Sequence, residues 1–219
     1  MHIYGPAFED LPTRLPVFPL AGVLLLPHGQ LPLNVFEPRY RRMIDDVLGT
    51  HRMIGIIQPR TACNSTNLYD VGCAGRIVNF TENEDGRYLI TLAGICRFKI
   101  QAEIDVADGK PYRTITPLWA GYNADMAPQT EKVAVDRARL NSILKTYFSR
   151  QEMSCDWDKV DITADADLLT ALAMICPLQP SEKQALLESA NVQTRTELFM
   201  TMIEMAARDM GDCDDTCCH

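Results

Sequence analysis

The sequence has no apolar run close to the length that a membrane-spanning helix needs, so such a helix is not expected. It also has no excess of positive charge, since 21 basic residues face 29 acidic ones and the net charge is -8. A surface of that sign repels phosphate backbones, which disfavours nucleic-acid and anionic-membrane partners. Residues 1–10 have no basic region followed by an apolar core, so no secretory signal is expected and we predict a cytoplasmic protein.

The motifs of nucleotide and covalent catalysis are also missing. No G-x-x-x-x-G-K-[ST] loop occurs, so the sequence lacks the motif whose backbone amides bind nucleotide phosphates. Nucleophilic catalysis by cysteine needs a neighbouring base, and Cys63 or Cys73 with His28 or His51 are the candidate pairs. No local signature surrounds any of them, and structural roles fit these residues better. We therefore predict that the protein is not an enzyme and needs no cofactor.

Eight cysteines are present, and without a secretory signal reduced thiols are the better interpretation. Three of them lie in the last residues together with a histidine, at Cys213, Cys217, Cys218 and His219. Such soft ligands suit zinc or copper(I), but adjacent cysteines strain a tetrahedral site built from one short loop. We predict a flexible, acidic, cysteine-rich tail over residues 211–219 without a metal; metal binding or redox sensing is the alternative.

Residues 15–48 organise the rest of the chain. Proline cuts the first part into three short apolar runs, which predicts short strands that bend around a small barrel. The spacing then changes, because Phe36, Tyr40, Met43 and Val47 stand four, three and four residues apart, as on one face of an α-helix. Gly49 follows the last of them as a C-terminal stop.

Further strands are predicted over residues 53–58, 71–82, 88–105 and 113–122, with a turn at 83–86. In the third of these, Phe98 and Ile100 alternate with Arg97 and Lys99, which predicts one buried face and one wet face. About six strands in all indicate a small closed barrel.

Beyond residue 122 the pattern becomes helical. Helices are predicted over 129–148, around Leu168, Leu172 and Ile175 with Asp165 as the cap, and after two capping boxes at 181–184 and 194–197. The fold class is therefore α+β, with a barrel domain over residues 1–124 that includes one or two helices. A helical bundle over 125–210 and the tail at 211–219 follow it.

Two stretches carry a family resemblance. The first is L-P-V-F-P-L at 15–20 with L-P-L-N-V-F-E-P-R-Y at 31–40, and the second is N-L-Y-D-V-G-C-A-G-R-I at 67–77. Together they resemble the N-terminal domain of the Lon ATP-dependent proteases, which is also seen in cereblon and in stand-alone bacterial proteins. The resemblance implies a PUA-like barrel that engages substrates, here without the ATPase and Ser-Lys protease domains that follow it in Lon.

The function that the resemblance implies is a polypeptide-binding or adaptor module in protein quality control. Its expected partners are unfolded or extended polypeptides, with a protease or a chaperone as a further partner. Where the motif turns from strand to helix we predict lining residues at Leu26, Phe36, Arg39 and Tyr40. An RNA-binding protein with a PUA-like barrel is the alternative, although the acidic charge speaks against it.

The arginine cluster at 39–42 and the leucines at 24–26 each have two interpretations. Arg39, Arg41 and Arg42 form either a solvated helix face or a partner-binding edge. The consecutive leucines at 24–26 belong to the core, or at least one of them faces outward toward the helical part.

Overall fold

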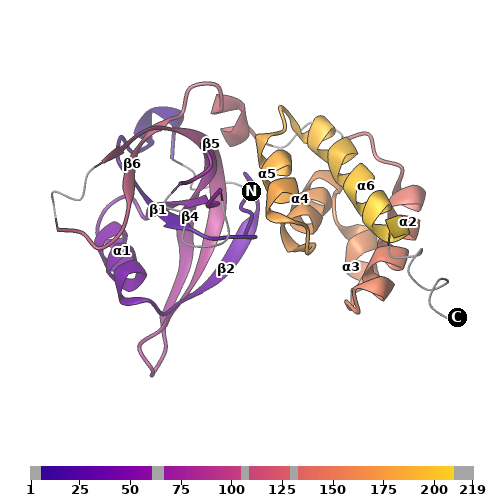
Figure 1. Cartoon of the computed structure of the whole chain (residues 1–219), viewed down its shortest axis with the longest axis horizontal. Coiled ribbons are helices and arrows are strands. Elements are labelled where there is room, and N and C mark those ends of the chain that lie inside the picture. The colour runs from indigo at the N-terminus through magenta and orange to yellow at the C-terminus, as the bar shows by residue number, and fades with distance from the viewer. Residues whose placement is uncertain (1–5, 61–66, 105–108, 129–132, 210–219) are drawn as a thin grey trace, which may run out of the picture.

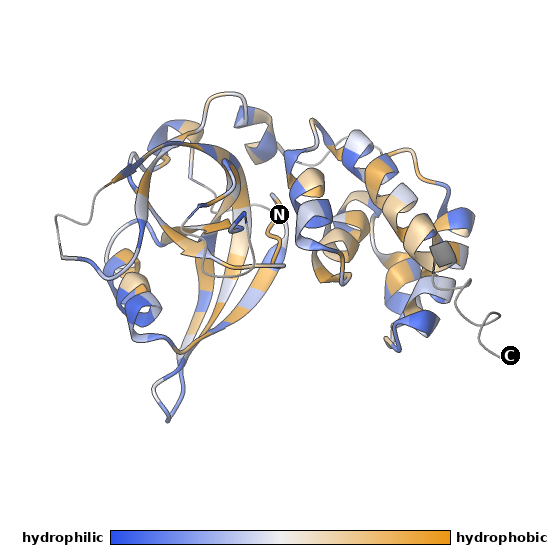
Figure 2. Cartoon of the chain, in the orientation of Figure 1, coloured by the Kyte–Doolittle hydropathy of each residue, from blue (hydrophilic) through white to orange (hydrophobic). Residues whose placement is uncertain are grey.

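The structure is a computed structural model of the chain and describes residues 6–60, 67–104, 109–128 and 133–209. A β-sheet with one long helix forms one part of the molecule, and a group of helices forms the other (Figure 1). Figure 2 shows hydrophobic residues concentrated along the strands, while the turn at the tip of the long hairpin is hydrophilic.

Six strands form one sheet. They are β1 (Leu15–Pro19), β2 (Gln30–Val35), β3 (Met53–Ile57), β4 (Val71–Glu82), β5 (Tyr88–Ile104) and β6 (Thr114–Leu118). Short 3-10 helices precede and follow them, η1 (Phe8–Asp10) and η2 (Asn123–Met126).

The strand order is β2-β5-β4-β3-β1-β6, and β6 pairs in turn with β5. The sheet therefore closes on itself, because β5 is long enough to pair with β2 near its start and with β6 near its end. β1 and β3 run parallel, and the other pairs are antiparallel. A mixed α+β fold with six strands is confirmed, and the more detailed likeness to a PUA barrel stays a prediction.

The prediction of three strands before the first helix is wrong for the middle run. Residues 23–26 form a loop between β1 and β2, and the leucines at 24–26 are all buried. A buried loop and a buried strand need the same apolar side chains, so the pattern could not separate them. The loop passes so close to β5 that a Cβ atom on Gly94 would lie 2.0 Å from the backbone oxygen of Leu26.

The first helix, α1 (Pro38–Leu48), begins after Glu37 with proline in its first turn. Its buried residues include Tyr40, Met43 and Val47, as the spacing predicts, and Gly49 is its C-cap. Phe36 is the exception, because it lies before the helix and is 63% exposed. The four-residue spacing to Tyr40 was therefore coincidental.

The second part contains α2 (Arg137–Arg150), α3 (Trp157–Ile162), α4 (Asp165–Ile175), α5 (Pro180–Glu188) and α6 (Val192–Asp209). The sequence predicts helices at α2, α4, α5 and α6 but misses the short α3, and the predicted caps of α4, α5 and α6 are displaced. Asp165 is the first residue of α4 rather than its cap, and its carboxylate pairs with Arg137 of α2. Asp165 therefore forms an ion pair with another helix, although N-cap preferences predict that it caps its own.

The two predicted capping boxes are also displaced toward the C-terminus. Helix α5 is capped by Gln179, whose backbone N–H donates to Glu182 at 2.7 Å. Helix α6 begins at Val192, two residues before the predicted box, and the Asn191 side chain before it accepts the Thr194 N–H at 2.8 Å. Several polar residues near each start could cap, and packing decides which one does.

Helix α5 fastens the helices to the sheet through side chains that bond to backbone of the other part. The Gln58 amide donates to the Pro180 carbonyl at 2.9 Å, and the Gln184 amide donates to Val71 of β4 at 3.1 Å. The Lys183 ammonium donates to the Gly22 carbonyl at 2.9 Å. One hydrophobic core joins the sheet, α1 and the helices of the second part. A second core uses residues that alternate with those of the first along β1, β3 and β4, such as Val17 beside Phe18, so it lies on the opposite face of these strands.

The domain boundaries predicted at residues 124 and 210 stay predictions, and the tail at 211–219 lies outside the described residues. None of the helices that the structure describes is both long and apolar enough to cross a membrane.

Candidate functional site

The four predicted lining residues do not form one surface. Phe36 and Arg39 are exposed, whereas Leu26 and Tyr40 are buried in the core. Arg39 pairs with Glu37, and its guanidinium lies 4.5 Å from the centre of the Tyr40 ring. The structure therefore presents Phe36 and Arg39 to solvent, with Tyr40 beneath Arg39.

The exposed position of Phe36 follows from its place in the chain. Val35 ends β2 with its side chain buried, and Pro38 starts α1, so Phe36 lies in the short connection between them. Neither the sheet nor the helix covers it. A phenylalanine this exposed leaves a large apolar surface in water, and it indicates a binding site where further exposed apolar side chains lie next to it.

Other exposed apolar side chains lie at the same end of the sheet. Leu89 of β5 is opposite Asn34 of β2, and Phe80 of β4 packs its ring against Tyr88 with 5.0 Å between the centres. Both Leu89 and Phe80 remain more than one-third exposed. Phe80 is opposite Ile90 and Leu89 is opposite Thr81 and Asn34, so Phe80 and Leu89 lie on opposite faces of the sheet. We call Phe36 and Leu89, which lie at the end of β2 and beside it, the apolar rim.

Strand β2 is the open edge beside this rim. In the sheet as described, β2 pairs with β5 alone, so its other side carries backbone groups without a strand partner. Pro32 lies within β2 and has no amide hydrogen, which suits an edge strand. An extended polypeptide could add to this edge by main-chain hydrogen bonds.

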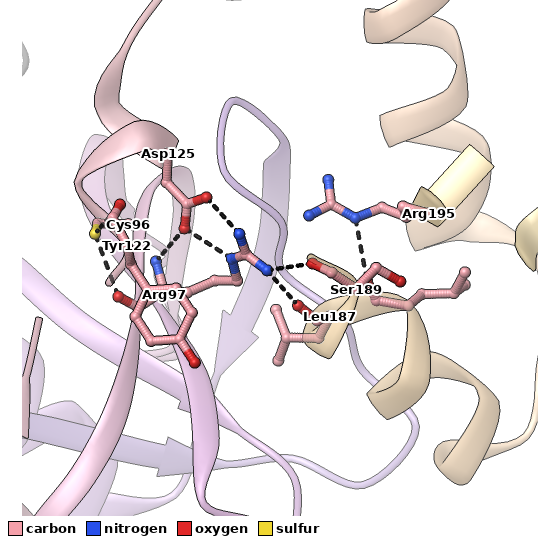
Figure 3. Close-up of polar contacts among 8 residues, drawn as sticks. Cys96, Arg97, Tyr122, Asp125, Leu187, Ser189 and Arg195 are labelled. Carbon is pink, nitrogen blue, oxygen red and sulfur yellow. Dashed lines mark hydrogen bonds and ion pairs between the residues drawn. The ribbon is translucent and has the colours of Figure 1, made fainter. Parts of the chain in front are cut away.

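A second feature lies where the sheet meets the helices, and sequence reasoning missed it. Arg97 of β5, expected on a wet face, is only 6% exposed. Its guanidinium makes a two-pronged contact with Asp125 of η2, at 2.8 Å from Nε and 2.7 Å from Nη2 (Figure 3). Its Nη1 donates to the carbonyls of Leu187, in the last turn of α5, and of Ser189, its C-cap.

This network satisfies the charge of Arg97. Burial opposes the charged form, but the hydrogen bonds and the negative charge of Asp125 outweigh it and raise the guanidinium pKa. Both carboxylate oxygens of Asp125 are occupied by Arg97, since Oδ2 also accepts its backbone N–H at 3.0 Å. No sequence motif signals the pair, because its members stand 28 positions apart.

Arg195 of α6 lies beside this network and is 5% exposed. Its Nε donates to the Leu186 carbonyl at 3.0 Å, and Figure 3 shows its terminal amines pointing into the space between sheet and helices. Burial, and then the positive charge of Arg97, lower the pKa of the Arg195 guanidinium to about 10.

A cleft of about 260 Å³ opens at this junction. Arg97, Asp125 and Arg195 supply its charged groups. The rest of its lining is mainly small and apolar: Pro27, Ala124, Ala127, Pro128, Val133, Ala166, Ala190 and Val192.

The other residues that the sequence proposes as nucleophiles, metal ligands or a partner-binding edge lie partly inside and partly outside the described residues. Cys73 is fully buried, and burial raises its thiol pKa well above the ordinary value, which opposes a nucleophilic role. Cys63 and the tail residues at 213–219 lie outside the described part of the chain. Within that part, no three histidine, cysteine or acidic side chains group closely enough to hold a metal ion. Of the arginine cluster, Arg42 pairs with Asp46 and Arg41 stacks on Tyr88.

Comparison with known proteins gives a family match over nearly the whole chain. Residues 14–205 match the family described as the ATP-dependent protease La (LON) substrate-binding domain. The Lon protease 2 of Sorangium cellulosum is 30% identical over 197 residues, and that of Myxococcus xanthus is 22% identical over 200 residues. These matches cover 86% and 89% of this chain but 24% of each relative, so the chain spans about a quarter of their length.

Two solved structures share the fold. A Lon N-terminal domain protein from Xanthomonas campestris superposes with a TM-score of 0.58 at 22% identity, covering 87% of this chain and 98% of that one. The N-terminal domain of a Mycobacterium avium complex Lon protease gives 0.58 at 18% identity, covering 87% and 97%.

Proposed function

Because the chain belongs to the family of ATP-dependent protease La (LON) substrate-binding domains, we propose that it is a non-catalytic module that binds unfolded or extended polypeptide segments. The family description supports this substrate class, since the substrates of a protease are polypeptides. The finer part of the proposal is that the bound segment is passed to, or shared with, a separate protease or chaperone.

One observation carries the proposal for the site. Strand β2 has an open edge, and it leads directly into Phe36, which is 63% exposed. An extended segment paired with β2 would gain main-chain hydrogen bonds, which any sequence can make. The apolar rim would bury a hydrophobic side chain of the segment, which folded proteins keep inside. The combination favours unfolded over folded chains.

The four predicted lining residues then have two roles in the proposal. Phe36 and Arg39 contact the bound segment, because both are exposed at the junction of β2 and α1. Leu26 and Tyr40 support that junction from within the core.

Fluorescence anisotropy tests the proposal with labelled lactalbumin in two forms, reduced and carboxymethylated or native with its disulfides intact. The unfolded form should bind and the native form should not. Phe36→Ser should weaken binding about tenfold or more, because burying a phenylalanine contributes roughly 1.5–3 kcal/mol.

Ile162→Ser is the matched control, since Ile162 of α3 is 83% exposed and lies in the helical part. Equal losses in the two variants would mean that apolar contact is unspecific, and no binding of the unfolded form would refute the function. The RNA-binding alternative is not favoured by the family match.

A further inference from the structure

We propose that the cleft between the sheet and the helices is a binding site for a carboxylate group, held by Arg195. This inference does not depend on polypeptide binding at β2, because it concerns different residues and a different surface. It starts from the charges that line the cleft.

Among the described residues that line the cleft, the positive charges outnumber the negative ones by one. Arg97 and Arg195 face a single acid, Asp125, among the lining residues. Asp125 directs both of its oxygens to Arg97 in hydrogen bonds of 2.7 to 3.0 Å. Among the described contacts Asp125 makes no hydrogen bond to Arg195, although its negative charge still acts on that guanidinium.

The guanidinium of Arg195 is left with unused donors. A guanidinium has five N–H groups in a rigid fork, and the Nε of Arg195 donates to the Leu186 carbonyl at 3.0 Å. The two terminal amines have no partner among the described residues and point into the cleft (Figure 3). The side chain is 5% exposed, and a charge largely removed from water is stabilised by an anion that bonds to its remaining donors. A ligand anion in the cleft would supply those bonds.

The geometry selects a carboxylate among anions. The free end of the fork presents two parallel donors, which match the two oxygens of a planar carboxylate. A single negative charge balances the excess, whereas a phosphate dianion would exceed it. The proline, alanine and valine lining suits a small apolar body behind the charged group.

The start of α6 adds to the positive character of the site. Asn191 and Val192 line the cleft, and α6 begins there and continues for 18 residues. The N-terminal end of a helix has a partial positive charge and favours anions. In a chain of net charge -8, this cleft is therefore a local site of the opposite sign.

A carboxylate could be the C-terminus of a peptide or an aspartate or glutamate side chain, and titration calorimetry of the whole chain separates them. The probes are N-acetyl-alanine, N-acetyl-aspartic acid α-amide and N-acetyl-alanine amide at constant ionic strength. The first carries a terminal carboxylate, the second a side-chain carboxylate, and the third none. At least one acid should bind, the tighter one identifies the source, and the neutral amide should not bind.

Arg195→Met should weaken binding about tenfold to a hundredfold, as expected for the loss of hydrogen bonds from a charged donor. Arg87→Met is the matched control, because Arg87 is an exposed arginine paired with Asp85 near the β4–β5 turn, and it should bind normally. Ala166→Leu fills the cleft while keeping Arg195 and should also abolish binding, which keeps the test valid if Arg195→Met fails to fold.

Equal binding of the neutral amide, or normal binding to folded Arg195→Met, would overturn the proposal. Tighter binding of inorganic phosphate than of either acid would overturn the assignment to carboxylate.

Discussion

At the scale of single residues, two neighbouring arginines show how a partner decides the role of a charge. Arg97 has a carboxylate and two carbonyls around it, so it joins η2 and the end of α5 to the sheet. Arg195 has one carbonyl through Nε. The first therefore stabilises the junction, and the second is available to a ligand.

Arg97→Met should lower the free energy of unfolding by about 3–5 kcal/mol, because it leaves Asp125 buried without its partner. Urea denaturation followed by circular dichroism measures this loss. Adding Asp125→Leu should restore part of it, since the double variant removes both charges. Arg60→Met, which breaks an exposed pair with Asp70, should cost about 1 kcal/mol or less. If both substitutions lowered the free energy of unfolding equally, the buried pair of Arg97 and Asp125 would stabilise the fold no more than an exposed pair.

At the scale of elements, a hydrogen bond ties α1 to the segment before β6. The Tyr112 hydroxyl donates to the Asp46 carboxylate at 2.6 Å, and Arg42 donates to the other oxygen at 3.0 Å. Burial raises the pKa of Asp46, but these two partners outweigh burial and leave the pKa lowered. The ionised form of Asp46 therefore stabilises the fold.

Tyr112→Phe should lower the free energy of unfolding by about 1 kcal/mol near pH 7. A carboxyl whose folded pKa is depressed stabilises above its unfolded pKa, about 3.9, and loses that contribution as pH falls through the folded pKa. The difference between wild type and variant should therefore narrow from about pH 4 downward. In an Asp46→Asn background the same substitution should give no such pH dependence in urea titrations. With Asp46 present, a difference in free energy of unfolding between wild type and Tyr112→Phe that stays constant down to pH 2 would contradict this.

At the scale of the whole molecule, the sheet and the helices share one hydrophobic core and several cross-bonds. The chain has 2 tryptophans, and each reports on one part. Trp119 packs against Phe98 of the sheet with 6.0 Å between ring centres, whereas Trp157 packs against Phe148 of α2 at 6.1 Å.

We expect the two parts to unfold together, because separating them would expose the shared core and the buried Arg97. Single-tryptophan variants test this, with Trp157→Phe reporting on the sheet and Trp119→Phe on the helices. Urea midpoints from fluorescence should coincide with those from far-ultraviolet circular dichroism within each variant. A helical signal that melts before the sheet signal would instead indicate two independent units.

Much of the candidate polypeptide site could be predicted from sequence, and the junction cleft could not. The strand-to-helix motif at 31–40 located the junction with Phe36 in the connection and Arg39 in the first turn of α1. The exposure of Phe36 and the burial of Tyr40 became clear only in three dimensions, since both fit one helical spacing. The cleft joins β5, η2 and α6, and no short motif links these elements.

The sequence by itself determined the family, most of the strands and helices in their order, and the apolar segments of the core. These follow from local patterns: alternation in β5, four-and-three spacing in α1, and prolines between short runs. Tertiary structure alone decided that residues 23–26 are a buried loop, that Asn191 caps α6, and that Arg97 pairs with Asp125 while Arg195 does not. The physical reason is that a polar group is satisfied by whichever partner packing brings near, and that partner can lie anywhere in the chain.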